Sequence, residues 1–143
     1  MSEAALFIYA NTFALACWIV LMLQPKRTAP LLRLVVPSLL AVLYIWALAT
    51  TPPNPDGGFG SLAAVKSLFS EDRAVLAGWV HYLAFDLFVG CWIVTDAAER
   101  GIAHLATVPC LVLTFMFGPA GLLLYFGLRW VSGRIGGAAV TGT

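Results

Sequence analysis

Residues 74–94 read AVLAGWVHYLAFDLFVGCWIV, an apolar run that contains one histidine, His81, and one acidic residue, Asp86. About 20 helical residues cross the ~30 Å hydrocarbon core of a bilayer, so this run predicts a transmembrane helix. An Asp at mid-bilayer depth costs roughly 2.5–3.5 kcal/mol on insertion scales. Such residues normally face a bundle interior and mark a site, a proton path or a structural hydrogen bond. The helix with His81 and Asp86 is therefore central to both the predicted fold and the predicted function.

The composition of the whole chain is typical of a membrane protein. Of its 143 residues, 61% are hydrophobic and 10% are charged, and its mean hydropathy is +0.91. A soluble domain carries roughly a quarter of its residues as Asp, Glu, Lys or Arg. The net charge is +1 and no Lys/Arg cluster is present, so the pattern excludes a nucleic-acid-binding protein.

Four apolar segments determine the predicted architecture. The first contains no charged residue, and the residues before it, Ser2 and Glu3, lack the basic region of a cleavable signal peptide. We therefore expect a retained helix there. The chain is predicted to be an all-α integral membrane protein, a bundle of four transmembrane helices in a single domain over residues 1–143. The expected spans are about residues 4–23, 34–50, 71–95 and 105–130.

The second and third spans are joined by a loop and a short amphipathic segment. Residues 52–58, PPNPDGG, cannot continue a helix and predict a loop. Residues 60–69 have a mild amphipathic pattern, which is typical of a short interfacial helix. Ser70 is expected to cap the third span, with Glu71 and Asp72 next to the positive end of its dipole.

The fourth apolar segment contains helix breakers. Pro109 and residues 117–121, FGPAG, interrupt it. Because Pro119 removes a backbone hydrogen bond, we expect a kink or a local break near the middle of the membrane. The tail rich in Gly, Ala and Thr, residues 135–143, is expected to be frayed.

Helical geometry places the polar residues of the third span on two sides. At about 100° per residue, Trp79, Tyr82 and Asp86 lie along one stripe, whereas His81 lies roughly 140° from Asp86. The two ionisable groups need not pair, but both can project into the interior from the two edges of the buried face. An acid and a base there make general acid–base chemistry available, so His81 and Asp86 are the candidate catalytic residues.

Aromatic side chains surround these two groups, and an interior lined by them would suit a flat or elongated apolar ligand. The candidate ligand-binding residues are Trp79, Tyr82, Phe85, Phe88 and Trp92 on the third span and Asn11 on the first. Structural alternatives stay open: Asp86 could fix a neighbouring helix through a hydrogen bond, and for the aromatic residues alone core packing is favoured. For Asn11 the first expectation is a helix–helix hydrogen bond.

Polar residues also gather at the connection after the third span. Asp96, Arg100 and His104 are typical of an interfacial turn with local ion pairs, so Asp96 and His104 receive only a supporting role around the site. Asp86 and Asp96 lie about 15 Å apart along a helix, and no Glu-x-x-His or His-x-x-x-His occurs, so no metal site is predicted. The sequence requires no cofactor, and it offers no second ligand for a haem on His81.

The run Trp79 to Gly90, WVHYLAFDLFVG, followed by Asp96, resembles the signature of the ABA4-like family, named for a plant abscisic-acid-deficient protein. Residues 69–72, FSED, and residues 117–121, FGPAG, resemble the family too, as does the spacing of four hydrophobic helices. The resemblance covers nearly the whole chain, and the W-x-H-x-x-x-x-D-L-F core is its most specific part.

The resemblance implies a small four-helix membrane protein related to neoxanthin synthesis, in which an epoxide of violaxanthin opens to an allenic carotenoid. Epoxide opening needs an acid at the epoxide oxygen and a base that takes a proton from the polyene side. By analogy, Asp86 would be the acid and His81 the base. Many relatives have Arg after the Gly of the motif, where this chain has Cys91. No Ser- and Arg-rich transit-like segment precedes the first helix, so the expected location is a bacterial inner membrane.

Two other functions fit the same pattern. One is a non-catalytic membrane protein that binds an apolar pigment or lipid, or assists another enzyme. This function needs the interior lined by aromatic side chains but not the acid and base. The other is a small proton- or ion-conducting oligomer, in which Asp86 would face water. The expected partners are membrane lipid and a carotenoid or other isoprenoid. Oligomerisation stays open, and nucleic acid is excluded.

Overall fold

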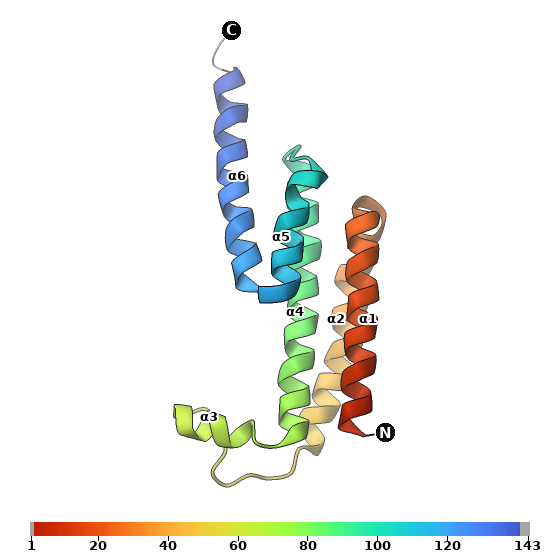
Figure 1. The fold of residues 1–143 in the computed structure, drawn as a ribbon, viewed down its shortest axis with the longest axis vertical. Coiled ribbons are helices and arrows are strands. Elements are labelled where there is room, and N and C mark those ends of the chain that lie inside the picture. The colour runs from red at the N-terminus through yellow and green to blue at the C-terminus, as the bar shows by residue number, and fades with distance from the viewer. Residues whose placement is uncertain (1, 141–143) are drawn as a thin grey trace.

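The computed structural model describes residues 2–140, with side chains through residue 133, and the regular elements in that part of the chain are α-helices. The prediction of an all-α fold is confirmed. In chain order the helices are α1 (Glu3–Leu23), α2 (Pro25–Thr50), α3 (Leu62–Leu68), α4 (Asp72–Glu99), α5 (His104–Phe117) and α6 (Pro119–Val140), as Figure 1 shows.

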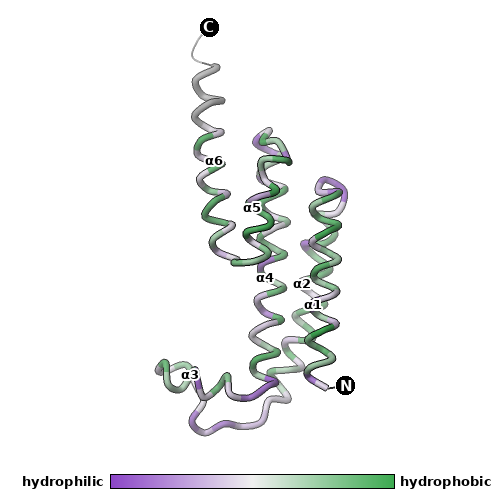
Figure 2. The backbone as a smooth tube through the Cα atoms, viewed as in Figure 1, coloured by the Kyte–Doolittle hydropathy of each residue, from purple (hydrophilic) through white to green (hydrophobic). Residues whose placement is uncertain are grey.

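Helix α4 is the central element of the fold. Figure 1 shows α1 and α2 packed along one side of it and the α5–α6 pair on the other. Within the described residues, α1, α2 and α4 are long and apolar enough to cross a membrane, whereas α5 is a shorter apolar helix of 14 residues. Hydrophobic residues predominate along these helices (Figure 2), and many large apolar side chains are exposed, as expected for helices surrounded by lipid.

The core between α1, α4 and α5 is built around Trp18. This side chain is 1% exposed and lies directly over Gly90 of α4. A Cβ atom at position 90 would lie 2.5 Å from Trp18 Cη2, so only a glycine leaves room for the indole ring. The indole also contacts Phe115 of α5, with the ring centroids 5.7 Å apart. The glycine thus allows α1 and α4 to approach each other closely, as small residues do in membrane bundles.

Arg73, at the start of α4, holds one end of the bundle together. Its guanidinium group donates to Glu3 of α1 through Nε at 3.1 Å and to the carbonyl oxygen of Thr50 at 2.9 Å. It also lies over the ring of Trp46 in α2, 5.4 Å from the centroid. One cation therefore connects the first turn of α1, the last turn of α2 and the first turn of α4.

Helix α2 is longer than the sequence predicted. It begins at Pro25 rather than near residue 34, and a single residue, Gln24, separates it from α1. Proline is favoured in the first turn of a helix because its missing N–H would have no intrahelical partner there. The basic residues after Pro25 are therefore part of a helix and not of a loop.

The segment predicted as one span over residues 105–130 is two antiparallel helices, so the expectation of a single fourth span is corrected. Gly118 ends α5 with φ +49° and ψ −102°, and Pro119 begins α6 without an N–H to continue the earlier helix. Gly121 lies against the backbone of Thr114 and Cys110, where a side chain would not fit, so α6 folds back closely on α5. Helix α6 extends to Val140. Of the tail expected to be frayed, residues 141–143 lie outside the described residues.

Helix α3 lies roughly across the bundle axis at one end of the molecule (Figure 1). It occupies Leu62–Leu68, within the segment 60–69 expected to be interfacial, and Ser61 caps it by accepting from the N–H of Ala64 at 3.1 Å. The expected cap of α4 is wrong: the N-cap position is Glu71, and Ser70 instead donates its hydroxyl to the carbonyl oxygen of Ser67.

Candidate functional site

Asp86 lies at the middle of α4, and its carboxyl group rests against the turn between α5 and α6. A Cβ atom on Gly118 would lie 2.9 Å from Asp86 Oδ1 and 3.1 Å from Oδ2, so the glycine backbone forms one wall of the site. Among the described residues Oδ2 has no hydrogen-bond partner although it is buried. An unsatisfied buried carboxylate oxygen is costly, and its presence indicates a place where a hydrogen-bond donor or a proton is received.

The turn that faces Asp86 is also the N-terminus of α6. This helix begins at Pro119, directly after Gly118. A helix N-terminus carries partial positive charge and stabilises a negative group placed beside it. In membrane proteins, helices that start at mid-depth are a recurrent way of building substrate and ion sites. The arrangement therefore favours a carboxylate that exchanges a proton or binds a polar group in otherwise apolar surroundings.

A chain of polar contacts runs from Asp86 toward the start of α4. The hydroxyl of Tyr82, which neighbours Asp86, donates to the carbonyl oxygen of Phe115 at 3.0 Å. The ring of Tyr82 contacts that of Trp79 at a centroid distance of 5.2 Å. Trp79 Nε1 donates to Asn11 Oδ1 at 3.0 Å, so the helix–helix hydrogen bond expected at Asn11 is confirmed. The stripe of Trp79, Tyr82 and Asp86 expected from the helical period is present.

Part of this stripe is open to the surroundings of the protein. The α5–α6 hairpin lies along the C-terminal half of α4, as Figure 1 shows, and its turn at Gly118 faces Asp86. Trp79, on the other half, is 38% exposed, and Phe7 of α1, whose ring centroid lies 5.4 Å away, is 39% exposed. A flat apolar molecule in the bilayer could therefore contact the rings of Phe7 and Trp79, two helical turns from Asp86 on the same stripe.

His81 lies on another face of α4 and is not brought together with Asp86. Its imidazole stacks on Phe85 at a centroid distance of 4.5 Å and contacts Tyr44 of α2 at 5.7 Å. This placement agrees with the large angular separation expected from the helical period. The two candidate catalytic groups therefore lie in different surroundings: His81 faces α2, and Asp86 faces the α5–α6 turn.

The remaining aromatic candidates are divided between these regions. Phe85 belongs with His81, and Phe88 is 44% exposed on the outer surface of α4. Trp92 packs edge-on against Tyr125 of α6, with the ring centroids 5.6 Å apart. Cys91, where many relatives are expected to carry Arg, is fully buried.

Asp96 forms a compact polar cluster between α4 and α6. Its Oδ2 accepts from the hydroxyl of Tyr125 at 2.6 Å and from Nε of Arg100 at 2.8 Å, and it lies 3.5 Å from Nε of Arg129. His104 is not part of this cluster. Its Nε2 lies 2.8 Å from the carbonyl oxygen of Met22, which connects α5 to the end of α1.

Sequence reasoning did not find Tyr125 or Arg129 as partners of Asp96. Their four-residue spacing places both on one face of α6, and this is the signal that could have identified them. The contact between Asp86 and Gly118 was also missed, because a helix break in the sequence says nothing about the residue it faces. Among the described residues no group of three His, Cys, Asp or Glu side chains is arranged to hold a metal ion.

The chain matches the model of a known protein family over most of its length. The family model described as ABA4-like, ABA DEFICIENT 4-like, matches residues 5–125. The chain is also 26% identical over 134 residues to the Arabidopsis thaliana protein named ABA DEFICIENT 4, chloroplastic. That alignment covers 86% of this chain and 60% of the plant protein's length. No solved structure shows significant similarity to the chain.

Proposed function

Because the chain belongs to the ABA4-like family, we propose that it is a membrane-embedded isomerase of a carotenoid or other isoprenoid, with Asp86 as its acid. The observation that carries the proposal is the carboxyl group of Asp86, whose buried Oδ2 lacks a partner among the described residues, beside the start of α6 at Gly118. A conjugated hydrocarbon dissolves in the bilayer, so a reactive group at mid-depth is where such a substrate would meet it.

The proposed reaction is the opening of an epoxide to an allenic alcohol, as in neoxanthin synthesis. Protonated Asp86 gives its proton to the epoxide oxygen, one carbon–oxygen bond breaks, and the adjoining polyene loses a proton from carbon. The substrate gains one proton and loses one, so the reaction is an isomerisation without an oxidant or reductant. The positive N-terminus of α6 stabilises the carboxylate that remains on Asp86.

In our proposal the base is the Asp86 carboxylate and not His81. His81, the base expected by analogy, faces α2, and its ring contacts are Tyr44 and Phe85. For His81 to act, a long substrate would have to reach both faces of α4. The Asp86 carboxylate already lies at the reacting end, so in our proposal it takes the proton back after the epoxide opens.

We further propose a membrane arrangement that suits this chemistry. Helices α1, α2 and α4 cross the bilayer, the α5–α6 hairpin enters with its turn near mid-depth, and α3 lies at the interface. Three observations support it: the apolar length of the three helices, the level of the turn at Gly118 beside the middle of α4, and the crosswise direction of α3 (Figure 1). Irregular backbone at mid-depth is tolerated where protein covers it, and Gly118 is buried.

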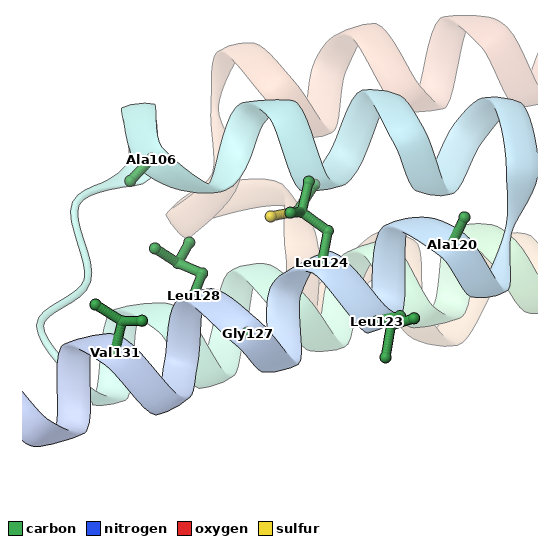
Figure 3. A pocket seen from close by; sticks show the side chains of 8 residues that line it. Ala106, Ala120, Leu123, Leu124, Gly127, Leu128 and Val131 are labelled. Carbon is green, nitrogen blue, oxygen red and sulfur yellow. The ribbon is translucent and has the colours of Figure 1, made fainter.

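A non-catalytic binder of a pigment or lipid is the second candidate, and one observation favours it. An open groove of about 610 Å³ runs along α5 and α6 and is lined almost entirely by apolar side chains, several of which Figure 3 shows. Leu124 and Leu128 of α6 and Cys110 of α5 are among its walls. Such a groove would hold a hydrocarbon chain without any reaction. An ion-conducting oligomer, by contrast, needs Asp86 to face water, and one oxygen of Asp86 is buried.

The deciding experiment is conversion of violaxanthin by the purified protein in lipid nanodiscs, followed by liquid chromatography of the extracted pigments. We expect an allenic product from the unaltered protein and its loss in Asp86→Asn, which preserves size but cannot act as an acid. Asp56→Asn, in the exposed loop, is the matched control and should keep full conversion. Conversion by Asp86→Asn at the unaltered rate would disprove the role of Asp86. Retention of pigment without conversion would favour the binding protein.

A further inference from the structure

A groove between α2 and α4 lies on the face of α4 that carries His81. Its volume is about 540 Å³, within the range of small-molecule sites. Pro37, Ser38 and Tyr44 from α2 and His81 and Phe85 from α4 are among the residues that line it. Most of the wall is apolar, and it contains no acidic or basic residue apart from the histidine.

The groove contains two hydrogen-bonding groups that nothing in the described part of the chain satisfies. Among the described residues the imidazole of His81, which is exposed at the surface of the bundle, makes ring contacts only, and the half-buried Tyr44 makes no hydrogen bond through its hydroxyl. Ser38 differs, because its hydroxyl donates to the carbonyl oxygen of Leu34 at 2.7 Å. In the membrane arrangement proposed above, this exposed imidazole faces hydrocarbon, where a polar group without a partner is costly. The two groups lie next to each other and therefore point to one shared partner.

The aromatic rings restrict the shape of that partner. Phe85 lies nearly parallel to the imidazole, at an interplanar angle of 29°, and is 58% exposed. The ring of Tyr44 is inclined to the imidazole by 50°. Offset aromatic surfaces of this kind favour a flat, conjugated ring over a flexible chain. A tyrosine O–H and an imidazole N–H both donate, so the ring should carry an acceptor oxygen.

We propose that the α2–α4 groove binds the head group of a lipid-soluble quinone. The flat ring contacts Phe85 and Tyr44, one carbonyl oxygen accepts from His81 and the Tyr44 hydroxyl, and the apolar side chain follows the groove past Ala41. The quinone binds at this site without electron transfer. The site is on a different face of α4 from Asp86, so it stands whether or not the isomerase proposal is correct.

Nuclear magnetic resonance of the protein in lipid nanodiscs tests this site directly. The chain has two histidines, and labelling their ring nitrogens with ¹⁵N gives one reporter in the groove and one reference outside it. The reference, His104, already has partners on both ring nitrogens, Met22 and Thr107. Titration with decylubiquinone should shift the His81 resonances in a saturable way and leave those of His104 in place. Decylbenzene, which has the same chain but no carbonyl oxygen, should shift neither.

Variants distinguish binding through the Tyr44 hydrogen bond from general partitioning of the quinone into lipid. Tyr44→Phe removes one donor and should weaken binding by about fivefold, whereas the same change at the exposed Tyr9 should leave it unaltered. Asp86→Asn should also bind normally, since its site is elsewhere. The proposal is overturned if His81 and His104 respond alike, if decylbenzene gives the same shift, or if Tyr44→Phe binds as tightly as the unaltered protein. It is overturned equally by a dimer in which a second copy already covers His81.

Discussion

The carboxyl group of Asp86 faces Gly118 so closely that a methyl group on the glycine would lie 2.9 Å from Oδ1. The two residues are separated along the chain by the end of α4, the whole of α5 and the connection between them. Their contact places an acid from the central helix at the start of a helix that begins half-way along the bundle. The proposed chemistry depends on this relationship, and the first prediction tests it.

Gly118→Ala should disturb both stability and function. The backbone at position 118 has φ +49°, which side-chain-bearing residues rarely adopt, and the new methyl group would press on both oxygens of Asp86. We expect a loss of about 1–3 kcal/mol in the free energy of unfolding and loss of pigment conversion. Unfolding in mixed detergent measures the first effect. Gly127→Ala is the matched control, because nothing lies within 4 Å of its added methyl group; an equal loss there would contradict the explanation.

Gly90→Ala should destabilise the contact between α1 and α4. The added methyl group would lie 2.5 Å from the indole of Trp18, which is almost completely buried. Overpacking of this kind costs about 1–3 kcal/mol. The measurement is again the free energy of unfolding, with Gly133→Ala, which has open space around it, as the control. If Trp18→Phe in the same chain does not reduce the cost of Gly90→Ala, the indole is not its cause.

Tyr125→Phe should weaken the attachment of α6 to α4. The substitution removes the hydroxyl that donates to Asp96 at 2.6 Å and leaves a buried aromatic ring of nearly the same shape. Hydrogen bonds to charged groups contribute about 1.5–3 kcal/mol, so we expect a loss of that order in unfolding measurements. Tyr9→Phe, at an exposed position on α1, should change nothing. Arg100→Gln should have a smaller effect than Tyr125→Phe, since its side chain is 44% exposed; the reverse order would count against this ranking.

Trp79→Phe should have little effect on stability and a larger effect on ligand binding. It breaks the hydrogen bond to Asn11, and such bonds between membrane helices average about 0.6 kcal/mol. A double-mutant cycle with Asn11→Leu should give a coupling energy of that size. Pigment retained by the purified protein should fall, because the exposed indole lies on the open side of Asp86. Unchanged retention would remove Trp79 from the site.

Much of the local structure could be predicted from the sequence. The apolar run around His81 and Asp86 predicted α4, and the helical period correctly placed Trp79, Tyr82 and Asp86 on one stripe with His81 elsewhere. Residues 117–121 predicted a break in the last apolar segment, and the break is at Gly118. These predictions succeeded because they depend on hydropathy, helical geometry and the chemistry of glycine and proline, which act over a few residues.

The predicted helix boundaries were less accurate at residues that can either begin a helix or interrupt one. The second span was expected to begin near residue 34, but α2 starts at Pro25, since the first turn of a helix accepts proline. Ser70 looked like a cap, yet the cap position of α4 is one residue later. In both cases several local arrangements satisfy the same backbone groups, and packing of the neighbouring helices selects one of them.

The sequence by itself determined that this chain is helical, apolar enough for a membrane and a member of the ABA4-like family, and it supplied His81 and Asp86 as candidates for chemistry. Only the tertiary structure decided what those residues face. It folded α6 back on α5 so that Gly118 lies against Asp86, turned His81 toward Tyr44, and paired Asp96 with Tyr125. The physical reason is that a periodic pattern specifies the face of a helix, whereas the partner of that face depends on close packing between distant segments.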